Sequence, residues 1–224
     1  MPRPLRIEYE DAWYHVMNRG GGYRDIYTKK KHRQIFLDVL AESVQQFGIE
    51  IHAYCLMDNH YHLLVKTPRS NLGRAMRHIN GVYTQRFNRE EKTDGPLFRG
   101  RYKAIIIEKD SYLLQVSRYI HLNPSVLKMV MFLERYPWSS YPGYLDKRRR
   151  EVWLRTNEIL AMVSNTNKGI SYRKFIESGL DEETNEFYSR KKLSLIFGKK
   201  RFRKKILRGL NDRKIKFSQP MLRT

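Results

Sequence analysis

The chain has 224 residues, of which 41% are hydrophobic and 12% aromatic, so a core of ordinary size is expected and extensive disorder is not. Its 44 Lys and Arg against 23 Asp and Glu give a net charge of +21, which favours polyanions such as nucleic acid as partners. The composition excludes a disulfide framework or a cysteine zinc cluster, since Cys55 is the single cysteine, and no apolar run approaches the ~20 residues of a membrane span.

The first predicted elements are a strand, a helix and a hairpin. Residues 12–18 (AWYHVMN) predict a strand that runs into the glycine loop RGGG. Residues 29–47 carry apolar residues at helical spacing, and Gly48 is suited to end that helix. Residues 49–57 and 60–66 predict two strands joined by a short polar turn.

A second helix, a strand and a third helix follow. Ser70 can cap a helix of residues 70–88. The segment YKAIIIE is β-branched and predicts a strand, after which Asp110 or Ser111 can cap a helix that Pro124 is suited to end. This order of elements predicts an antiparallel sheet covered by helices, in the α+β class.

The chain changes character after its first 145 residues. We expect a catalytic domain in residues 1–145, a helical extension in 146–189 and a basic tail in 190–224. Fourteen basic residues and one acidic residue give the tail a charge of +13. The segment KKRFRKKILRGL favours a basic helix with an apolar stripe, Phe202, Ile206 and Leu210. A solvated, partly disordered tail is the alternative.

Two histidines stand one residue apart in the run MDNHYHLLV. In a strand, His60 and His62 project from the same face while Tyr61 points away. Two adjacent imidazoles form half of a metal site. An isolated pair of this kind is more often structural, so a further ligand is needed to favour the metal site.

The helix SYLLQVSRYIHLN offers such a partner. Tyr119 and Asn123 stand one turn apart on one face, and Tyr112 and Gln115 lie on the preceding turns. His121 lies nearly opposite Tyr119, so we exclude it from the same site. Taken alone, Tyr119 is an ordinary surface or half-buried tyrosine.

Together these motifs resemble a known family. HYH in a strand, followed by RYIHLNP on a helix, is similar to the HUH single-strand DNA nucleases and, within them, to the single-tyrosine transposases. The run from RPLRIEYEDAWYHVMNRG through FRGRYKAIIIE to YIHLNP and YPWSSY resembles the REP-associated tyrosine transposases. The resemblance covers residues 3–145, and residues 151–224 match nothing we can assign. It implies a ferredoxin-like HUH core.

The resemblance also implies roles for individual residues. His60 and His62 would be metal ligands, and Tyr119 would attack DNA to form a 5′-phosphotyrosine. Many single-tyrosine transposases carry a third ligand, Gln, one turn after the nucleophile, where this chain has Asn123, as the REP-associated branch does. The implied cofactor is a divalent ion, Mg²⁺ or Mn²⁺.

Basic residues beside aromatic rings predict the DNA contacts. Phosphate contacts and base stacking are expected around FRGRYK and the glycine loop. The candidates are Arg19, Arg24, Arg99, Arg101 and Lys103. An ordinary basic surface is the alternative for each of them. The glycine loop lacks the Lys-Ser/Thr of a nucleotide-binding P-loop, so ATP binding is not indicated.

We therefore expect a transposase-like single-stranded DNA endonuclease and strand transferase. Its partners would be single-stranded DNA and palindromic hairpins, with no membrane partner, and the protein would be a monomer or homodimer. The N-terminus has no apolar segment typical of a signal peptide, so we expect a cytoplasmic, nucleoid-associated location. Two alternatives stay open, a domesticated protein that binds hairpins without cutting and a metal hydrolase that activates water.

Overall fold

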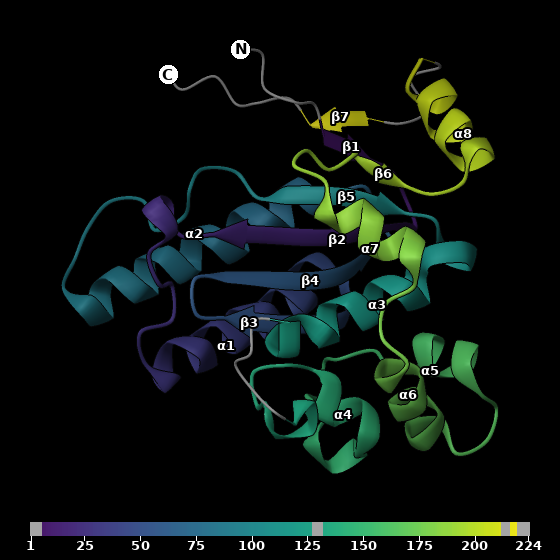
Figure 1. Ribbon diagram of the computed structural model, residues 1–224. Helices are drawn as coiled ribbons and strands as arrows, with labels where there is room; N and C mark the ends of the chain where they lie inside the picture. Colours follow the sequence, from purple (N-terminus) through teal and green to yellow (C-terminus); the bar gives the residue numbers. More distant parts are fainter. Residues whose placement is uncertain (1–5, 127–131, 212–215, 219–224) are drawn as a thin grey trace.

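A central five-stranded sheet organises the molecule. The computed structural model describes residues 6–126, 132–211 and 216–218 and confirms the α+β class (Figure 1). The sheet order is β3-β4-β2-β5-β6. Its strands are β2 (Ala12–Arg19), β3 (Glu50–Met57), β4 (His60–Thr67), β5 (Lys103–Ile107) and β6 (Ile196–Phe197). A second, two-stranded sheet pairs β1 (Arg6–Glu8) with β7 (Lys216–Ser218).

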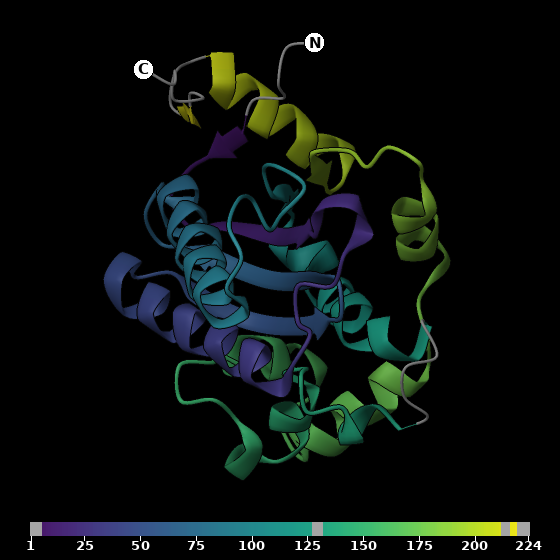
Figure 2. The same ribbon diagram turned by 90° about the vertical axis from the view of Figure 1, so that its left-hand side faces the viewer.

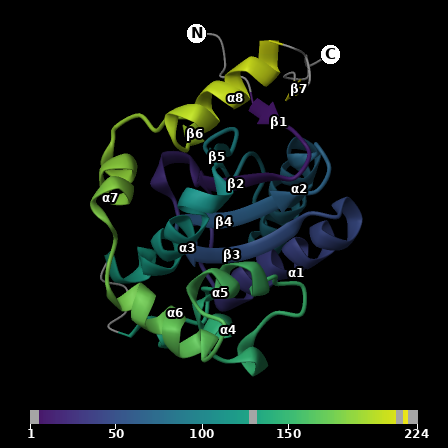
Figure 3. The same ribbon diagram turned by 90° about the vertical axis from the view of Figure 1, so that its right-hand side faces the viewer.

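Helices cover both faces of the central sheet. α1 (Lys30–Phe47) and α2 (Leu72–Glu91) lie side by side on one face, and α3 (Lys109–Val126) lies on the other (Figures 2 and 3). The remaining α-helices are α4 (Tyr141–Leu145), α5 (Asn157–Val163), α6 (Lys168–Glu177), α7 (Glu182–Ser189) and α8 (Lys200–Asn211). Among the described residues, the 3₁₀ turns are η1 (Gly21–Tyr23), η2 (Leu133–Arg135) and η3 (Lys147–Arg149).

Tyr61 fixes which face of β4 is core. Its ring is fully buried and lies 4.9 Å from the Phe36 ring of α1, and its hydroxyl donates to Asn80 Oδ1 of α2 at 2.8 Å. Burial of such a ring stabilises the fold by about 2–3 kcal/mol. Because side chains alternate along a strand, His60 and His62 face the opposite side, where α3 lies.

Two helix ends differ from the sequence prediction. Ser70 does not cap α2, because Asn71 occupies the N-cap position, and Ser70 Oγ has no hydrogen-bond partner among the described residues. α3 begins at Lys109, before both predicted caps, and Pro124 does not end it. Pro124 lies inside α3, which continues at least to Val126, and its missing N–H removes one hydrogen bond. Gly48 ends α1 in the left-handed conformation (φ 64°), as predicted.

The C-terminal part of the chain contributes a strand to the central sheet. β6 pairs in parallel with β5, with Ile196 opposite Ile106. α8 is a basic helix whose Ile206 is buried, with Phe202 and Leu210 half-buried beside it, as the apolar stripe predicts. Residues 212–215 and 219–224 of the expected tail lie outside the described residues, and the boundaries at 145 and 189 stay predictions. Within the described ranges, no helix is long and apolar enough to cross a membrane.

Candidate active site

His60 and His62 lie together at the start of β4, as predicted. Their ring centroids are 5.1 Å apart and the rings are nearly perpendicular. His62 is buried and His60 is half-buried. The β3–β4 turn holds this end of the strand next to the chain after β2, since Asn59 O accepts from the Gly20 N–H at 2.9 Å.

In each ring the Nδ1 atom is engaged by a neighbour. His60 Nδ1 lies 2.6 Å from Asn59 Oδ1, and His62 Nδ1 lies 2.9 Å from Nε2 of His15. Because Asn59 Oδ1 can only accept, His60 Nδ1 carries the proton and its Nε2 keeps a lone pair. Neither Nε2 takes part in the hydrogen bonds found among the described residues. The pair is therefore suited to bind a metal through Nε2.

Tyr119 and Asn123 come from α3 on the same side of the sheet. The Tyr119 ring meets His62 edge-on, with centroids 5.8 Å apart and an interplanar angle of 84°. Asn123, one turn later, is buried, and its Nδ2 donates to Tyr119 O at 2.8 Å. This bond leaves the amide oxygen of Asn123 as a possible ligand. The structure thus brings Tyr119 to the histidine pair and keeps Asn123 beside it.

Burial sets the charge of these groups. It lowers the pKa of His60 and takes that of His62 well below its ordinary value, so both imidazoles are neutral at pH 7 and can act as ligands. Burial raises the pKa of Tyr119, and a hydrogen bond with the Asn123 side chain partly offsets this. Tyr119 is therefore a neutral phenol at pH 7, and a nearby cation would favour its ionisation.

His15 and Tyr188 complete the cluster, and sequence analysis missed both. His15 lies on β2 and is fully buried; Tyr188 lies on α7, and its hydroxyl is 2.7 Å from His15 Nδ1. The Tyr188 ring also stacks on Tyr119 with centroids 3.6 Å apart and an interplanar angle of 11°. For His15, the available signal was a histidine within a predicted strand. Tyr188 is 173 positions from His15 and offered none.

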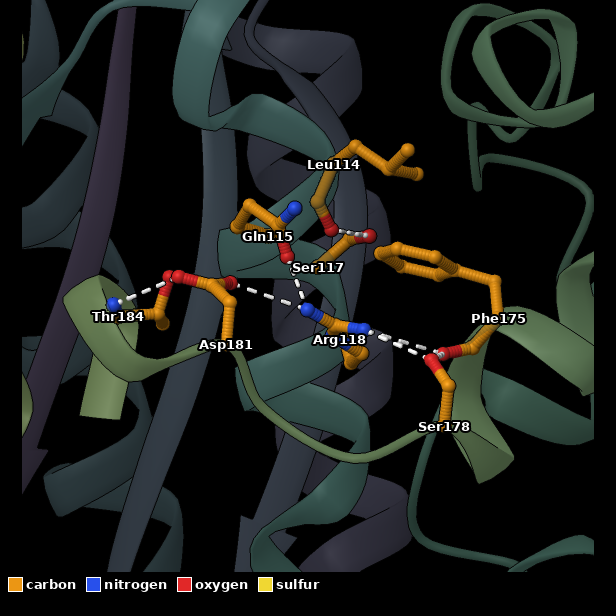
Figure 4. A network of polar contacts seen from close by, with 8 residues as sticks. All are labelled: Leu114, Gln115, Ser117, Arg118, Phe175, Ser178, Asp181 and Thr184. Carbon is orange, nitrogen blue, oxygen red and sulfur yellow. Dashed lines mark hydrogen bonds and ion pairs between the residues drawn. The ribbon is translucent and has the colours of Figure 1, made fainter.

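Arg118, next to Tyr119 in sequence, holds α7 in place. Its buried guanidinium donates to Ser178 Oγ and to Asp181 Oδ2, each at 3.0 Å (Figure 4). Asp181 caps α7 by accepting from the Thr184 N–H at 2.9 Å. A charge-assisted bond from α3 therefore fixes the start of the helix that carries the stacked tyrosine.

Tyr112 and His121, the other tyrosine and the histidine considered on α3, have partners outside the site. Tyr112 donates to Glu183 Oε1 at 2.5 Å, and its ring centroid lies 4.2 Å from that of Phe197. His121 is fully buried, and its ring bonds the hydroxyl of Tyr172. His121 therefore lies outside the cluster of His62 and Tyr119, as expected.

Three of the predicted DNA-contact residues gather near His60. Arg19 is opposite His60 in the β2–β4 register, and its guanidinium lies 4.1 Å from the centroid of the Tyr23 ring. The exposed Arg99 is tied to this point by its N–H, which donates to Arg19 O at 2.8 Å. The Arg24 guanidinium donates to the carbonyls of residues 96 and 97, which uses part of its donor capacity.

Of the other two predicted contacts, Lys103 on β5 is opposite Met17, which is in turn opposite His62 in the sheet register, and Arg101 comes just before β5. They line a cavity of about 840 Å³ between β5 and residues 191–195. Other cations line it as well, namely Arg6, Lys191 and Lys192. All five residues therefore stay candidate DNA contacts.

The donor set fits a divalent ion in chemistry. Two neutral imidazole nitrogens and an amide oxygen suit Mn²⁺ and leave positions for phosphate oxygens and water. In the part of the chain that the structure describes, no three His, Cys, Asp or Glu side chains form a metal site. A site at His60 and His62 would therefore depend on Asn123 or on the substrate for further ligands.

Comparison with known proteins identifies the family. The sequence model of the IS200-like transposases matches residues 8–123, which include both β4 histidines, Tyr119 and Asn123. The chain is an IS200-like transposase. No curated protein sequence matches it. Family membership confirms the predicted transposase class and a transposase-like function in DNA processing.

One solved structure agrees with the fold of this IS200-like transposase, and a second is similar over part of the chain. A REP-associated tyrosine transposase bound to a REP hairpin is similar over 69% of this chain and 92% of its own, with 15% identity and a TM-score of 0.56. A putative transposase from Deinococcus radiodurans R1 has 19% identity and a TM-score of 0.38, over 54% and 95% of the two chains. The first similarity confirms the predicted fold of the REP-associated transposases.

Proposed function

We propose that this transposase is a divalent-metal-dependent DNA transesterase that cuts single-stranded DNA beside hairpins through a 5′-phosphotyrosine on Tyr119. The observation that carries the proposal is the contact of the Tyr119 ring with His62, on the strand face shared with His60. A hydroxyl nucleophile beside two neutral imidazoles is the arrangement that metal-assisted phosphoryl transfer needs.

The proposed reaction is a transesterification, in which one phosphate ester bond forms as another breaks. The Tyr119 oxygen attacks the phosphorus, the bond from phosphorus to the 3′ oxygen breaks, and the phenolic proton ends on the released 3′-OH. A bound divalent ion would polarise a non-bridging phosphate oxygen and favour the phenolate. Since the phosphotyrosine keeps the energy of the ester, a second 3′-OH can reverse the step and transfer the strand.

Hairpin binding is supported by charge and by one relative. Arg19 stacked on Tyr23 and the exposed Arg99 lie beside His60, where they would hold phosphates and an unpaired base near the nucleophile. The similar REP-associated transposase is bound to a REP hairpin. We therefore propose hairpins with adjoining single strands as the substrate class.

A protein that binds hairpins without cutting is the second candidate. The Tyr188 ring covers one face of Tyr119 at 3.6 Å, which favours a nucleophile that is not free to reach DNA. A metal hydrolase, the third possibility, would need no tyrosine.

A covalent-adduct assay separates the three. A hairpin substrate with a single-stranded flank carries a label at its 3′ end, because the fragment with the 5′ phosphate stays on the protein. With Mn²⁺, the wild-type protein should give a labelled band that survives denaturing electrophoresis. Tyr119→Phe, which removes only the hydroxyl, should lose this band and cleavage while it keeps hairpin binding.

Tyr112→Phe is the matched control, because it removes a hydroxyl from the same helix that contacts Glu183 instead. It should retain the adduct. Cleavage without an adduct would replace the proposal by the hydrolase, and hairpin binding with neither would replace it by the binding protein.

A further inference from the structure

We propose that His15 and Tyr188 are positioning residues that hold His62 in the tautomer able to bind a metal. This inference rests on the proposed metal site. Three groups form one chain of hydrogen bonds, from the Tyr188 hydroxyl through both nitrogens of His15 to His62 Nδ1, at 2.7 and 2.9 Å. His15 is fully buried, so water does not substitute for either partner.

The sheet register places the two histidines within reach. β2 and β4 are antiparallel with Met17 opposite His62, and His15 is two residues before Met17 on the same face. His15 is therefore the diagonal cross-strand neighbour of His62, a spacing that long or aromatic side chains bridge. The His15 and His62 ring centroids are 5.1 Å apart.

Proton positions in this chain are coupled. If Tyr188 donates to His15 Nδ1, then His15 carries its proton on Nε2 and donates to His62 Nδ1. His62 then holds its own proton on Nε2 and cannot bind a metal there. If Tyr188 instead accepts from His15 Nδ1–H, then His15 Nε2 accepts from His62 Nδ1–H, and His62 Nε2 is free. The acceptor role of the Tyr188 oxygen thus selects the ligand form of His62.

The C-terminal extension holds the Tyr188 hydroxyl oxygen beside His15. The Arg118 bonds to Ser178 and Asp181 fix the start of α7, and stacking on Tyr119 fixes the Tyr188 ring. The same ring therefore contacts the proposed nucleophile with its face and the ligand-orienting histidine with its hydroxyl. Partners of this kind orient metal-binding histidines in many sites.

Mn²⁺ affinity of the full chain, measured by electron paramagnetic resonance without DNA, tests the proposal. His15→Leu removes the acceptor for His62 Nδ1–H and should weaken Mn²⁺ binding ~10- to 100-fold. His15→Gln restores an acceptor oxygen at the position of Nε2 and should recover most of the affinity. Tyr188→Phe keeps the stacked ring, removes the acceptor for His15, and should weaken binding about tenfold.

Tyr112→Phe is again the matched control, since its hydroxyl also joins α3 to α7 but does not touch His15. It should leave Mn²⁺ affinity unchanged. Hairpin binding and a cooperative thermal transition establish that each variant is folded.

The tautomer itself gives a second readout. Long-range ¹H–¹⁵N correlation spectra of the metal-free protein should place the His62 proton on Nδ1 in the wild type and move it to Nε2 in His15→Leu. Wild-type Mn²⁺ affinity and an unmoved proton in His15→Leu would overturn the positioning role alone. If instead the wild type failed to bind Mn²⁺, the proposed metal site would fall and the positioning role with it.

Discussion

Two His–Tyr pairs link the core to C-terminal helices, one from β2 and one from α3, and their hydrogen-bond geometry is nearly the same. His15 Nδ1 lies 2.7 Å from the Tyr188 hydroxyl, and His121 Nδ1 lies 2.7 Å from that of Tyr172. Both histidines are fully buried, and burial lowers the pKa of each to about 3. Each tyrosine comes from a helix of the C-terminal extension, α7 in one case and α6 in the other.

The pairs differ in what the second nitrogen of each histidine meets. His121 Nε2 bonds Ser140 Oγ at 2.7 Å, and Tyr172 donates on to Ser117 at 3.1 Å. Both serines donate on to main-chain carbonyls, those of Tyr54 and Leu114, where the network ends. His15 Nε2 instead meets His62, whose own Nε2 is left for a ligand. The two pairs thus share the contact between histidine Nδ1 and a tyrosine hydroxyl. They differ in the partner of histidine Nε2, and this partner separates a structural role for His121 from the proposed positioning role of His15. We name the two networks the closed pair (His121 and Tyr172) and the open pair (His15 and Tyr188).

Removing both histidines of the HYH motif gives the largest expected effect. The double variant His60→Ala, His62→Ala removes both proposed metal ligands, of which His62 bonds His15 of the open pair. We expect adduct formation with Mn²⁺ to fall by at least ~100-fold, because the ion contributes several kcal/mol to the transition state. Hairpin affinity, measured by gel shift, should stay within severalfold, since it comes mainly from basic residues. Undiminished cleavage would exclude a metal site at the HYH motif.

The closed pair should respond in stability. His121→Ala leaves a cavity and deprives Tyr172 and Ser140 of a partner, so we expect a loss of about 3 kcal/mol in the free energy of unfolding. Urea denaturation measures it. Mn²⁺ affinity should not change. His60→Ala, which truncates a half-buried ring, is the comparison and should cost about 1 kcal/mol or less. Equal losses in the free energy of unfolding for His121→Ala and His60→Ala would contradict a structural role specific to His121.

Lower pH should reduce the contribution of the closed pair to the free energy of unfolding. Burial lowers the folded pKa of His121 to about 3, against ~6.5 when unfolded, so the unfolded state binds more protons between these values. The contribution of neutral, buried His121 to the free energy of unfolding is complete above pH ~6.5 and is lost as pH falls toward 3. The loss at pH 5 is about 2 kcal/mol. Urea unfolding at pH 5, 6 and 7.5 measures this slope. In His121→Gln it should be smaller by up to one proton, and an unchanged slope would contradict the assignment.

α8 touches neither pair and should give the smallest effect. Lys204, Lys205 and Arg208 are exposed on it, while Ile206 packs inward. Replacing these three cations by Gln should lower hairpin affinity by roughly tenfold or less and reduce the salt slope by up to ~3. Mn²⁺ affinity and stability should not change. A salt slope equal to that of the wild type would show that α8 does not contact DNA.

The comparison also explains what the sequence could predict. His60 with His62, and Tyr119 with Asn123, are joined by strand and helix periodicity, so local geometry was enough to group them. The role of His15 depends on the register between β2 and β4, and local patterns do not fix that register. The cap assigned to Ser70 failed because Asn71 occupies the N-cap of α2, and the stop assigned to Pro124 failed because α3 continues past it to Val126.

The distance in sequence between His15 and Tyr188 has a consequence during protein synthesis. The two residues are 173 positions apart, so a ribosome adding 5–20 residues per second takes roughly 10–35 s to supply Tyr188 after His15. The nascent chain holds β2, β4 and α3 throughout the last part of that interval, but α7 is missing. β5 likewise waits for β6 and presents an open edge to neighbouring nascent chains. Translation speed through the last third of the message should therefore govern how much of this protein aggregates before it matures.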